Sequence, residues 1–150
     1  YSIGIETTLY SAIRNDNILQ LVINNSVFGM TGGQMSPTSL PGMKTTTSPF
    51  GRDERKNGSM MDITKILGNT DMAYLARCAV NSPSNIEKTK KAIKTALTKQ
   101  MNGEGFCLVE VLSMCPTNWK MSEVDACEFI KNTQSKALPL GEFINKGGEK

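Results

Sequence analysis

An asparagine pair at the end of an apolar run is the part of this sequence whose residue types could do chemistry. Asn24 and Asn25 close the run ILQLVI (18–23). Three glycines follow within a few positions: Gly29, Gly32 and Gly33. A side-chain amide can offer a neutral oxygen to magnesium, and glycines let backbone N–H groups point at phosphate oxygens. The pattern therefore indicates a site for a phosphate with its metal ion, and the alternative interpretation is a simple Asn–Gly turn.

The sequence contains no histidine, which excludes Ser–His and Cys–His catalytic pairs and histidine-rich metal sites. Four cysteines lie in or beside apolar segments at irregular spacings, without a CxxC motif: Cys78, Cys107, Cys115 and Cys127. This spacing does not suit a disulfide framework. If the protein is an enzyme, a bound cofactor or a partner must therefore carry the reaction.

Length and charge indicate one domain. The 150 residues are 39% hydrophobic, enough for a single core over 1–150. Part of the net charge of +3 comes from EKTKKAIKTALTK (87–99), which has no interleaved aromatic residues. We interpret its lysines as a solvated helix face, with docking of an acidic protein as the alternative, and we expect no nucleic-acid partner. No apolar run approaches the ~18 residues of a membrane span, so we expect a cytoplasmic protein without membrane contact.

Hydrophobic periodicity alternates between helix and strand along the chain. Helices are expected at 5–13, 63–67, 84–101 and 122–131, and strands at 18–23, 72–80 and 105–112. Asp62, Ser84 and Ser122 are the predicted N-caps of the last three helices. The tail 137–150 shows no period.

This alternation predicts an α/β fold, a parallel sheet with helices on both faces. Such sheets bind ligands beyond the carboxyl ends of their strands, where Asn24 and Asn25 would lie. The segment 26–61 is long and without clear periodicity, and such loops usually bind something or are disordered. We therefore interpret 26–61 as a ligand-binding loop.

The segment INNSVFGMTGGQMSPTSLPGMKTTTSPFG (23–51) resembles the thiamine-diphosphate loop of the beta subunits of 2-oxoacid:ferredoxin oxidoreductases. Phe28 replaces a more usual tyrosine. YSIGIETTLYSAIRNDNI and GFCLVEVLSMCPTNW are also similar to segments of this family, so the resemblance covers about 1–145. It is strongest for the branch that uses branched-chain oxoacids or 2-oxoglutarate. The implied fold is the diphosphate-binding domain of thiamine-dependent enzymes.

The resemblance implies a magnesium ion that bridges the protein and the cofactor diphosphate. Its ligands here would be the side chain of Asn25 and the backbone carbonyl of Val27. The residues implied to follow the cofactor are Ser26, Gly29, Met30 and Thr31, with Met30 near the thiazolium. The cofactor itself would carry the decarboxylation, which a histidine-free chain allows.

Cys115 is implied to be the last thiolate ligand of a four-iron four-sulfur (4Fe–4S) cluster whose other ligands lie outside this chain. It sits in SMCPTNW, after a strand and before Pro116. Without the resemblance, a lone cysteine would be read as an inert buried residue. The other three cysteines are expected in the core, Trp119 is expected to be a packing anchor, and the nine methionines should fill gaps in the core and at a subunit contact.

The family pattern also contains segments that 1–150 lacks. A GDGD motif that supplies a magnesium-binding aspartate would fall just before Tyr1, and a CxxC region that supplies cluster ligands is absent. We therefore expect an N-terminally incomplete, C-terminal part of a larger subunit, inactive alone, with 26–61 as its most mobile region. Implied partners are an alpha subunit that supplies a catalytic glutamate, further gamma and delta subunits, ferredoxin, coenzyme A and the 2-oxoacid.

Two alternative functions remain open from the sequence. One is a related thiamine-diphosphate-dependent decarboxylase or carboligase without a cluster. The other is a non-enzymatic fragment that serves as an assembly surface. The Cys115 turn separates the first alternative from the oxidoreductase, because only the oxidoreductase needs a cluster ligand there.

Overall fold

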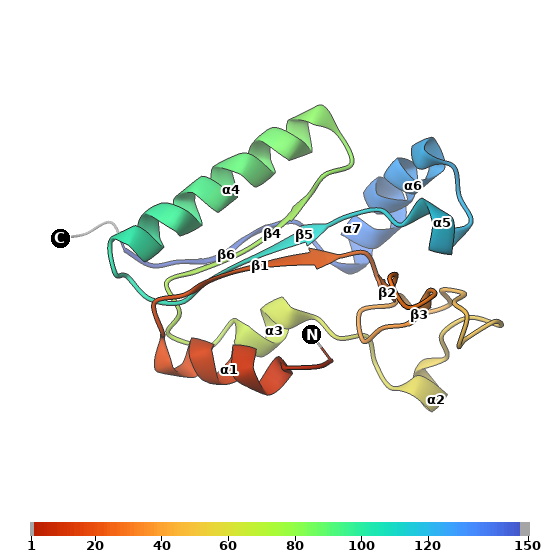
Figure 1. Ribbon diagram of the computed structural model, residues 1–150, viewed down its shortest axis with the longest axis horizontal. Coiled ribbons are helices and arrows are strands. Elements are labelled where there is room, and N and C mark those ends of the chain that lie inside the picture. The colour runs from red at the N-terminus through yellow and green to blue at the C-terminus, as the bar shows by residue number, and fades with distance from the viewer. Residues whose placement is uncertain (1, 148–150) are drawn as a thin grey trace.

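Three parallel strands and one antiparallel strand form the central sheet (Figure 1). The structure, a computed structural model, describes residues 2–147. The strand order is β1-β5-β4-β6, with bounds Leu19–Asn24, Cys107–Leu112, Tyr74–Ala79 and Gly141–Asn145. β1 and β4 both pair in parallel with β5, whereas β6 runs antiparallel to β4. The predicted parallel α/β sheet is therefore confirmed, with one antiparallel strand added at its edge.

Strand β6 corrects the interpretation of the tail. Only Ile144 of this strand is buried, so its sequence shows no hydrophobic alternation. Backbone pairing with β4 forms the strand instead, and a search for apolar periodicity does not detect that. Residues 148–150 of the predicted tail lie outside the described residues.

Helices cover both faces of the sheet (Figure 1). On one face, α1 (Ile5–Arg14) and α3 (Ile63–Leu67) pack with β4 and β5 in a cluster that contains Ala12, Leu67, Leu75 and Leu108. On the other face, α4 (Pro83–Met101) packs Ala92 and Ala96 against Ala76 and Val109. Successive strand residues thus point to opposite faces, as the pleat requires. The central strand β5 is buried along its whole length, which explains its nearly continuous apolar sequence.

Two of the three predicted helix caps are confirmed. Asp62 accepts a hydrogen bond from the Thr64 backbone N–H, and Ser122 accepts one from that of Asp125. The predicted cap of α4 is wrong, because Ser82 and not Ser84 caps the helix, with Pro83 in the first turn. Proline suits that position because its missing N–H would have no helical partner there.

The last helical region runs further than its predicted end at residue 131. It consists of α6 (Glu123–Phe129), a π-helical segment η1 (Ile130–Gln134) and α7 (Ser135–Ala137). A π-helical turn disturbs the 3.6-residue period, so the apolar pattern fades where the helix continues. The turn buries Gln134, which reaches toward the end of β1.

The long loop 26–61 contains regular pieces. Strands β2 (Val27–Phe28) and β3 (Gln34–Met35) form a short hairpin, and α2 (Glu54–Asn57) is a single helical turn. Arg52 is buried and donates to five backbone carbonyls, those of Ser36, Pro37, Ser39, Gly58 and Ser59. The loop is therefore folded around one guanidinium. The expectation that it is the most mobile region stays a prediction.

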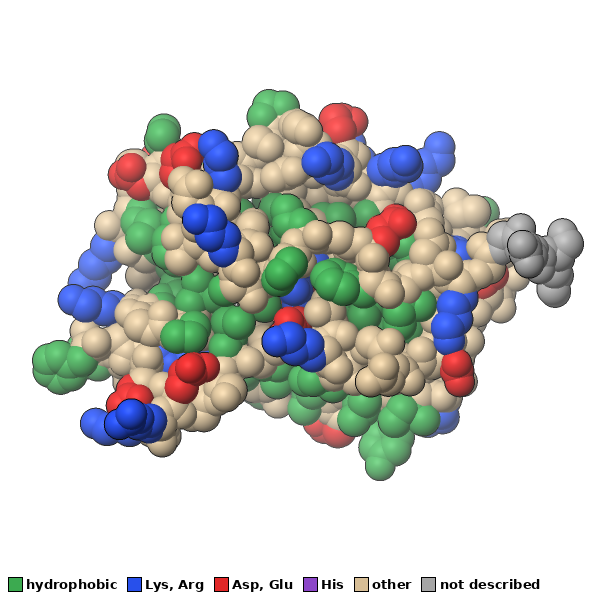
Figure 2. Space-filling view, turned by 180° about the vertical axis from the view of Figure 1, so that it is seen from behind, with side chains coloured by type: hydrophobic (Ala, Val, Ile, Leu, Met, Phe, Trp, Pro, Cys, Tyr) green, Lys and Arg blue, Asp and Glu red, His purple; other side chains and the backbone are tan. Residues whose placement is uncertain are grey.

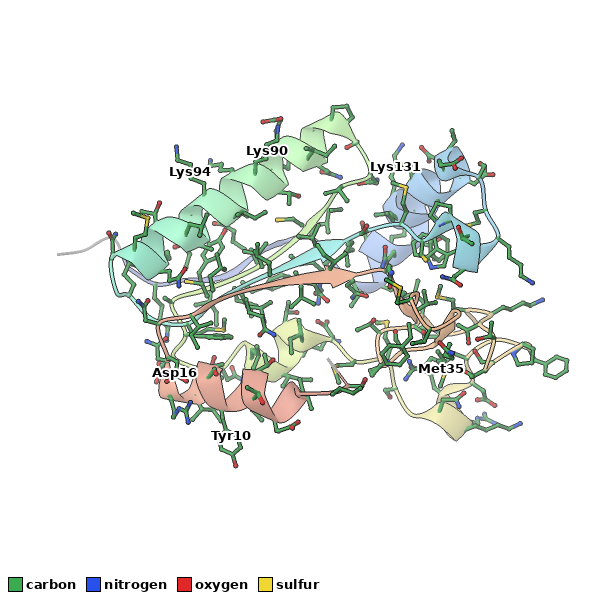
Figure 3. The ribbon with its side chains drawn as sticks, viewed as in Figure 1. Tyr10, Asp16, Met35, Lys90, Lys94 and Lys131 are labelled. Atoms are coloured by element: carbon green, nitrogen blue, oxygen red, sulfur yellow. The ribbon has the colours of Figure 1, made fainter. Side chains whose placement is uncertain are left out.

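The lysines of α4 mostly fit the predicted solvated face. Lys90 and Lys94 point away from the sheet (Figure 3). Lys99 is an exception, since it is buried and donates to Glu104 and to the Lys146 carbonyl. Seen from behind, positive side chains are scattered among negative and uncharged ones and do not form one basic patch (Figure 2).

The remaining sulfur residues divide between core and surface. Cys107 is buried as expected, and Cys78 and Cys127 are only half-buried. Met72 lies in the core, whereas Met30 and Met101 are exposed. Among residues 2–147, none of the helices combines the length and apolarity needed to cross a bilayer.

Candidate functional site

The asparagine pair lies at the carboxyl end of the parallel sheet, beside the turn that follows the central strand. Asn24 is the last residue of β1, and its carbonyl accepts from the backbone N–H of Ser113, just after β5, at 3.0 Å. Figure 1 shows the β2–β3 hairpin and α5 (Pro116–Trp119) together beyond these strand ends. The structure thus brings the loop after Asn24 and the turn that contains Cys115, two parts of the segments that carry the family resemblance, to the same end of the sheet.

A left-handed turn at Ser26 shapes the start of the loop. Ser26 has φ 58, a conformation that costs a non-glycine residue of order 1 kcal/mol and must be held by its surroundings. Three hydrogen bonds hold it: its N–H donates to Asn24 Oδ1 at 3.0 Å, its hydroxyl accepts from Gln134 Nε2 at 2.9 Å, and its carbonyl accepts from Ser39 Oγ at 2.5 Å. The next side chains of the turn are therefore fixed in direction.

Asn25 borders a cavity of about 200 Å³ lined by residues 22–25, 27–28 and 36–38. Its Oδ1 makes only a long hydrogen bond, 3.4 Å, with the Val27 N–H, while its backbone carbonyl accepts from Trp119 Nε1 at 3.1 Å. Val27, whose carbonyl is the other ligand implied by the resemblance, is the first residue of β2 and also lines this cavity. An amide oxygen and a carbonyl oxygen are ligands that magnesium accepts, so the donor set fits part of a magnesium shell.

The lining of this cavity includes no carboxylate among the residues that the structure describes. Magnesium usually takes one or two carboxylates in addition to phosphate oxygens and water. Asn25 and Val27 therefore suit two positions of an octahedral site and do not complete it. The prediction that they bind magnesium stays a prediction.

Two of the glycines serve the packing of the loop against α5. Gly33 has φ +77, and a Cβ there would lie 2.6 Å from Asn118 Oδ1. The Asn118 amide also donates to the Gly29 carbonyl at 3.2 Å. Met30 and Thr31 lie between these glycines at the exposed tip of the hairpin, where Thr31 Oγ1 donates to Gln34 at 2.7 Å. The tip of the hairpin is therefore open to a ligand. The other end of the hairpin, at Gly29, is hydrogen-bonded to Asn118 in the helical turn that follows Cys115.

Cys115 lies next to Gly29 and Asn118, where the hairpin meets α5. It precedes the first turn of α5, and its Sγ accepts a hydrogen bond from Asn118 Nδ2 at 3.1 Å. A Cβ on Gly29 would lie 3.4 Å from the same sulfur. No three histidine, cysteine or acidic residues within 2–147 come together to bind a metal, so Cys115 alone cannot hold a cluster. Its assignment as a cluster ligand stays a prediction.

A buried charged network behind the site was not anticipated from the sequence. Arg77 in β4 and Glu110 in β5 are each 1% exposed and form an ion pair with Nε–Oε2 at 2.5 Å. Arg77 also pairs with Asp62 at 2.5 Å, and Glu110 Oε1 accepts from Asn24 Nδ2 at 2.8 Å. The available signal was a charged residue in the middle of each of two apolar strands, YLARCA and CLVEVL.

Asp62 and Arg77 keep their charges despite burial. Burial opposes ionisation of Asp62, but hydrogen bonds from Arg77 and Thr64 outweigh it and hold the pKa of this carboxyl below its usual range. Burial likewise opposes the charge on Arg77, and the carboxylates of Glu110 and Asp62 raise the pKa of the guanidinium. One guanidinium therefore faces two carboxylates in the core.

The fold is that of an α/β domain whose loops meet at the carboxyl ends of parallel strands, beside the turn at the end of β1. Residues 3–111 match the family described as "Thiamine pyrophosphate enzyme, C-terminal TPP binding domain". The chain belongs to this family.

Relatives of known function are similar over most of this chain. The ketoisovalerate oxidoreductase subunit VorA of Methanothermobacter thermautotrophicus is 38% identical over 149 residues, which are 99% of this chain and 31% of that protein. The 2-oxoglutarate synthase subunit KorB of Archaeoglobus fulgidus is 37% identical over 130 residues, 87% of this chain and 45% of that protein. The chain thus spans less than half the length of either relative.

A solved structure shares the fold. The 2-oxoglutarate:ferredoxin oxidoreductase from Magnetococcus marinus, with 2-oxoglutarate, coenzyme A and succinyl-CoA bound, superposes with a TM-score of 0.69 at 23% identity. The match covers 99% of this chain and 54% of that one. The expected diphosphate-binding fold is therefore confirmed.

Proposed function

We propose that this chain is the thiamine-diphosphate-binding part of a 2-oxoacid:ferredoxin oxidoreductase, which converts a 2-oxoacid and coenzyme A to an acyl-CoA and passes electrons to ferredoxin. The similarity to VorA and KorB supports a branched-chain 2-oxoacid or 2-oxoglutarate as the substrate. An alpha subunit would supply the glutamate that activates the cofactor, in a complex that also contains gamma and delta subunits.

One observation carries this proposal: the loop that begins at Asn25 is hydrogen-bonded to the turn that contains Cys115. Asn118 bridges the two, since its amide donates both to Cys115 Sγ and to the Gly29 carbonyl, at 3.1 and 3.2 Å. A decarboxylase without a cluster has no need for a thiolate beside its cofactor loop. An oxidoreductase does, because electrons must pass from the cofactor to a cluster.

The residues of this chain would bind and orient the cofactor. When bound, thiamine diphosphate supplies the electron sink that decarboxylation of a 2-oxoacid requires. Asn25 Oδ1 and the Val27 carbonyl would hold the magnesium ion of the diphosphate, and an aspartate outside this chain would complete the shell. Met30 would supply an apolar contact at the hairpin tip, and Thr31 and Ser26 would flank the cofactor. Cys115 would hold one iron of a 4Fe–4S cluster.

The metal assignment is tested by Asn25→Ala in the complete subunit. Loss of one magnesium ligand should raise the apparent Kd for thiamine diphosphate at least about tenfold, or about 1.4 kcal/mol. Calorimetric titration with the cofactor in excess magnesium measures this. Asn132→Ala, which removes an exposed amide from the helical region after Phe129, is the matched control and should bind like wild type. Equal curves for Asn25→Ala and wild type would refute the assignment.

The reaction class is tested in the assembled enzyme with 2-oxoisovalerate or 2-oxoglutarate. We expect carbon dioxide release to require both coenzyme A and an electron acceptor such as methyl viologen. Release of carbon dioxide and free aldehyde without an acceptor would instead identify a cluster-free decarboxylase. The two outcomes exclude each other, so one assay decides between the two candidate functions.

A further inference from the structure

Both ends of the loop 26–61 are attached to the same buried ion pair. Asn24, just before the loop, donates from Nδ2 to Glu110 at 2.8 Å. Asp62, just after it, accepts from Arg77 Nη2 at 2.5 Å. Arg77 and Glu110 face each other across β4 and β5 in register and are joined at 2.5 Å. A loop of more than thirty residues thus starts and finishes on one four-residue unit in the core.

The unit also reaches the wall of the cavity beside Asn25. Asn24 Oδ1 accepts from the backbone N–H of Ser26 at 3.0 Å and from Thr38 Oγ1 at 2.8 Å. The first bond sets the turn that contains Asn25, and the second holds the segment 36–38, which also lines the cavity. The Asn24 amide therefore links Glu110 to two segments of the cavity lining.

Stability alone is a weak reason for such a unit. Burying ions in a protein core costs several kcal/mol for each ion, and apolar replacements of similar volume are often as stable. Both polar atoms of the Asn24 amide and both oxygens of the Glu110 carboxylate have hydrogen-bond partners, however, and this fixes the direction of the Asn24 side chain. Buried polar groups bonded in this way specify one arrangement of the groups that they join.

We propose that Arg77 and Glu110, acting through Asn24, are positioning residues that fix the cofactor loop and aim Asn25 at the magnesium ion. This inference rests on the proposed function for the identity of the ligand. The arrangement of the loop itself does not depend on that ligand, because all the bonds that carry the argument lie within the protein.

The direction of the Asn24–Glu110 hydrogen bond, with Asn24 as donor and Glu110 as acceptor, can be reversed by substitution, and this tests the proposal in the complete subunit. In Asn24→Asp, two carboxylates face each other. In Glu110→Gln, the side chain at position 110 loses its negative charge and one of the two oxygens that accept from Asn24 and Arg77. The double variant Asn24→Asp/Glu110→Gln restores the pattern. The new amide nitrogen at position 110 can donate to the new carboxylate at position 24, and the amide oxygen can accept from Arg77.

Two measurements are made on each variant. The apparent Kd for thiamine diphosphate with magnesium should rise at least about tenfold in each single variant and return to within about threefold of wild type in the double variant. Amide hydrogen exchange without cofactor should accelerate at residues 26, 36, 38 and 39 in the single variants and recover in the double variant. Glu104→Gln, which breaks the Lys99–Glu104 ion pair at the opposite end of the sheet, is the control and should change neither.

Each outcome is decisive. Single variants with lowered melting temperatures but wild-type Kd and wild-type exchange would overturn the proposal, since the network would then serve stability alone. A double variant no better than the single variants would overturn it as well. If wild type binds no cofactor, the proposed function fails, and the exchange measurement still decides whether the network positions the loop.

Discussion

Asn24 and Asn25 are chemically identical neighbours with different environments. Asn24 is 5% exposed, and both ends of its amide bond to protein groups, Glu110 on one side and Ser26 and Thr38 on the other. Asn25 leaves its amide oxygen with one long bond at the cavity. The difference follows from the end of β1, where the last strand residue points into the core and the next one does not. The second asparagine is therefore the one available to a ligand.

The role of Cys115 can also be tested by a single substitution. In the complete enzyme, Cys115→Ser should leave cofactor binding nearly unchanged, because the hydrogen bond of the sulfur comes from Asn118 in α5, and the serine hydroxyl can accept from the same amide. Loss of a thiolate ligand should reduce the iron content and abolish ferredoxin reduction. Iron analysis and the visible spectrum measure this, with Cys127→Ser as control. An unchanged iron content would refute the cluster assignment.

The pKa of Asp62 predicts how stability depends on pH. This pKa is lowered in the folded protein, so the carboxylate stabilises the folded state above its unfolded pKa of about 3.9. The contribution is lost as the pH falls through the folded pKa. Urea unfolding between about pH 2 and 6 should therefore show a shallower acid decline for Asp62→Asn than for wild type.

Asp71→Asn is the control for this loss of stability at low pH. Asp71 pairs with Lys146 at the exposed surface, where ion pairs contribute little to the free energy of unfolding. Its unfolding free energy should follow the wild-type curve. Parallel curves for Asp62→Asn and wild type would show that the Asp62–Arg77 pair does not contribute to the acid sensitivity of the fold.

At the scale of elements, the loop depends on one buried side chain. Arg52 joins 36–39 to 58–59 through its hydrogen bonds to carbonyls. Arg52→Met would leave buried carbonyls without partners and should lower the free energy of unfolding by at least about 2 kcal/mol. Urea unfolding measures the loss, and amide exchange should accelerate over 36–60. Lys44→Met, an exposed change in the same loop, should have neither effect, and a stable Arg52→Met protein with a slowly exchanging loop would contradict this account.

The elements with strong periodicity were predictable from sequence, and those held by tertiary bonds were not. Strand β5 shows a clear apolar pattern because it is buried along its whole length. Strand β6 is exposed on most of its length and forms through backbone pairing, so no pattern marks it. The choice between Ser82 and Ser84 as cap depended on Pro83, which suits the first helical turn.

The candidate site was predictable only in part, for a similar reason. The asparagine–glycine motif is local, and its place at a strand end follows from the order of elements. The Arg77–Glu110 pair depends on the register between two strands that are far apart in the chain. A charged residue in each strand was visible, but its partner was not. The five bonds of Arg52 likewise join segments whose contact no local pattern specifies.

At the scale of the whole molecule, the proposed magnesium site is incomplete within the described residues. The cavity beside Asn25 offers neutral oxygens, and no carboxylate lines it among the described residues. Magnesium with so few protein ligands should bind weakly. We therefore expect the 150-residue chain alone to show no micromolar binding of thiamine diphosphate and no decarboxylation. Isothermal titration with magnesium and cofactor measures this, and tight saturable binding would show that no further ligand is needed.

That titration needs a check on the state of the protein. β1 is an edge strand, and its Leu21 and Ile23 are 49% and 65% exposed. Apolar edge strands are prone to pair with other chains. Light scattering should therefore accompany the titration, and Leu21→Lys, at a residue that does not line the cavity, provides a version of the chain with a charged edge. Absence of binding in a monomeric Leu21→Lys sample would exclude self-association as its cause.

The position of Trp119 gives the protein an optical reporter. It is the only tryptophan in the sequence, its indole N–H donates to the Asn25 carbonyl at 3.1 Å, and its ring meets that of Phe129 edge-on at 5.0 Å between centroids. Indole emission responds to hydrogen bonding and to the polarity around the ring. A ligand that moves the Asn25 turn should therefore change the emission maximum or the intensity of the tryptophan fluorescence. Occupancy of the site can then be followed in real time, without a label and without turnover.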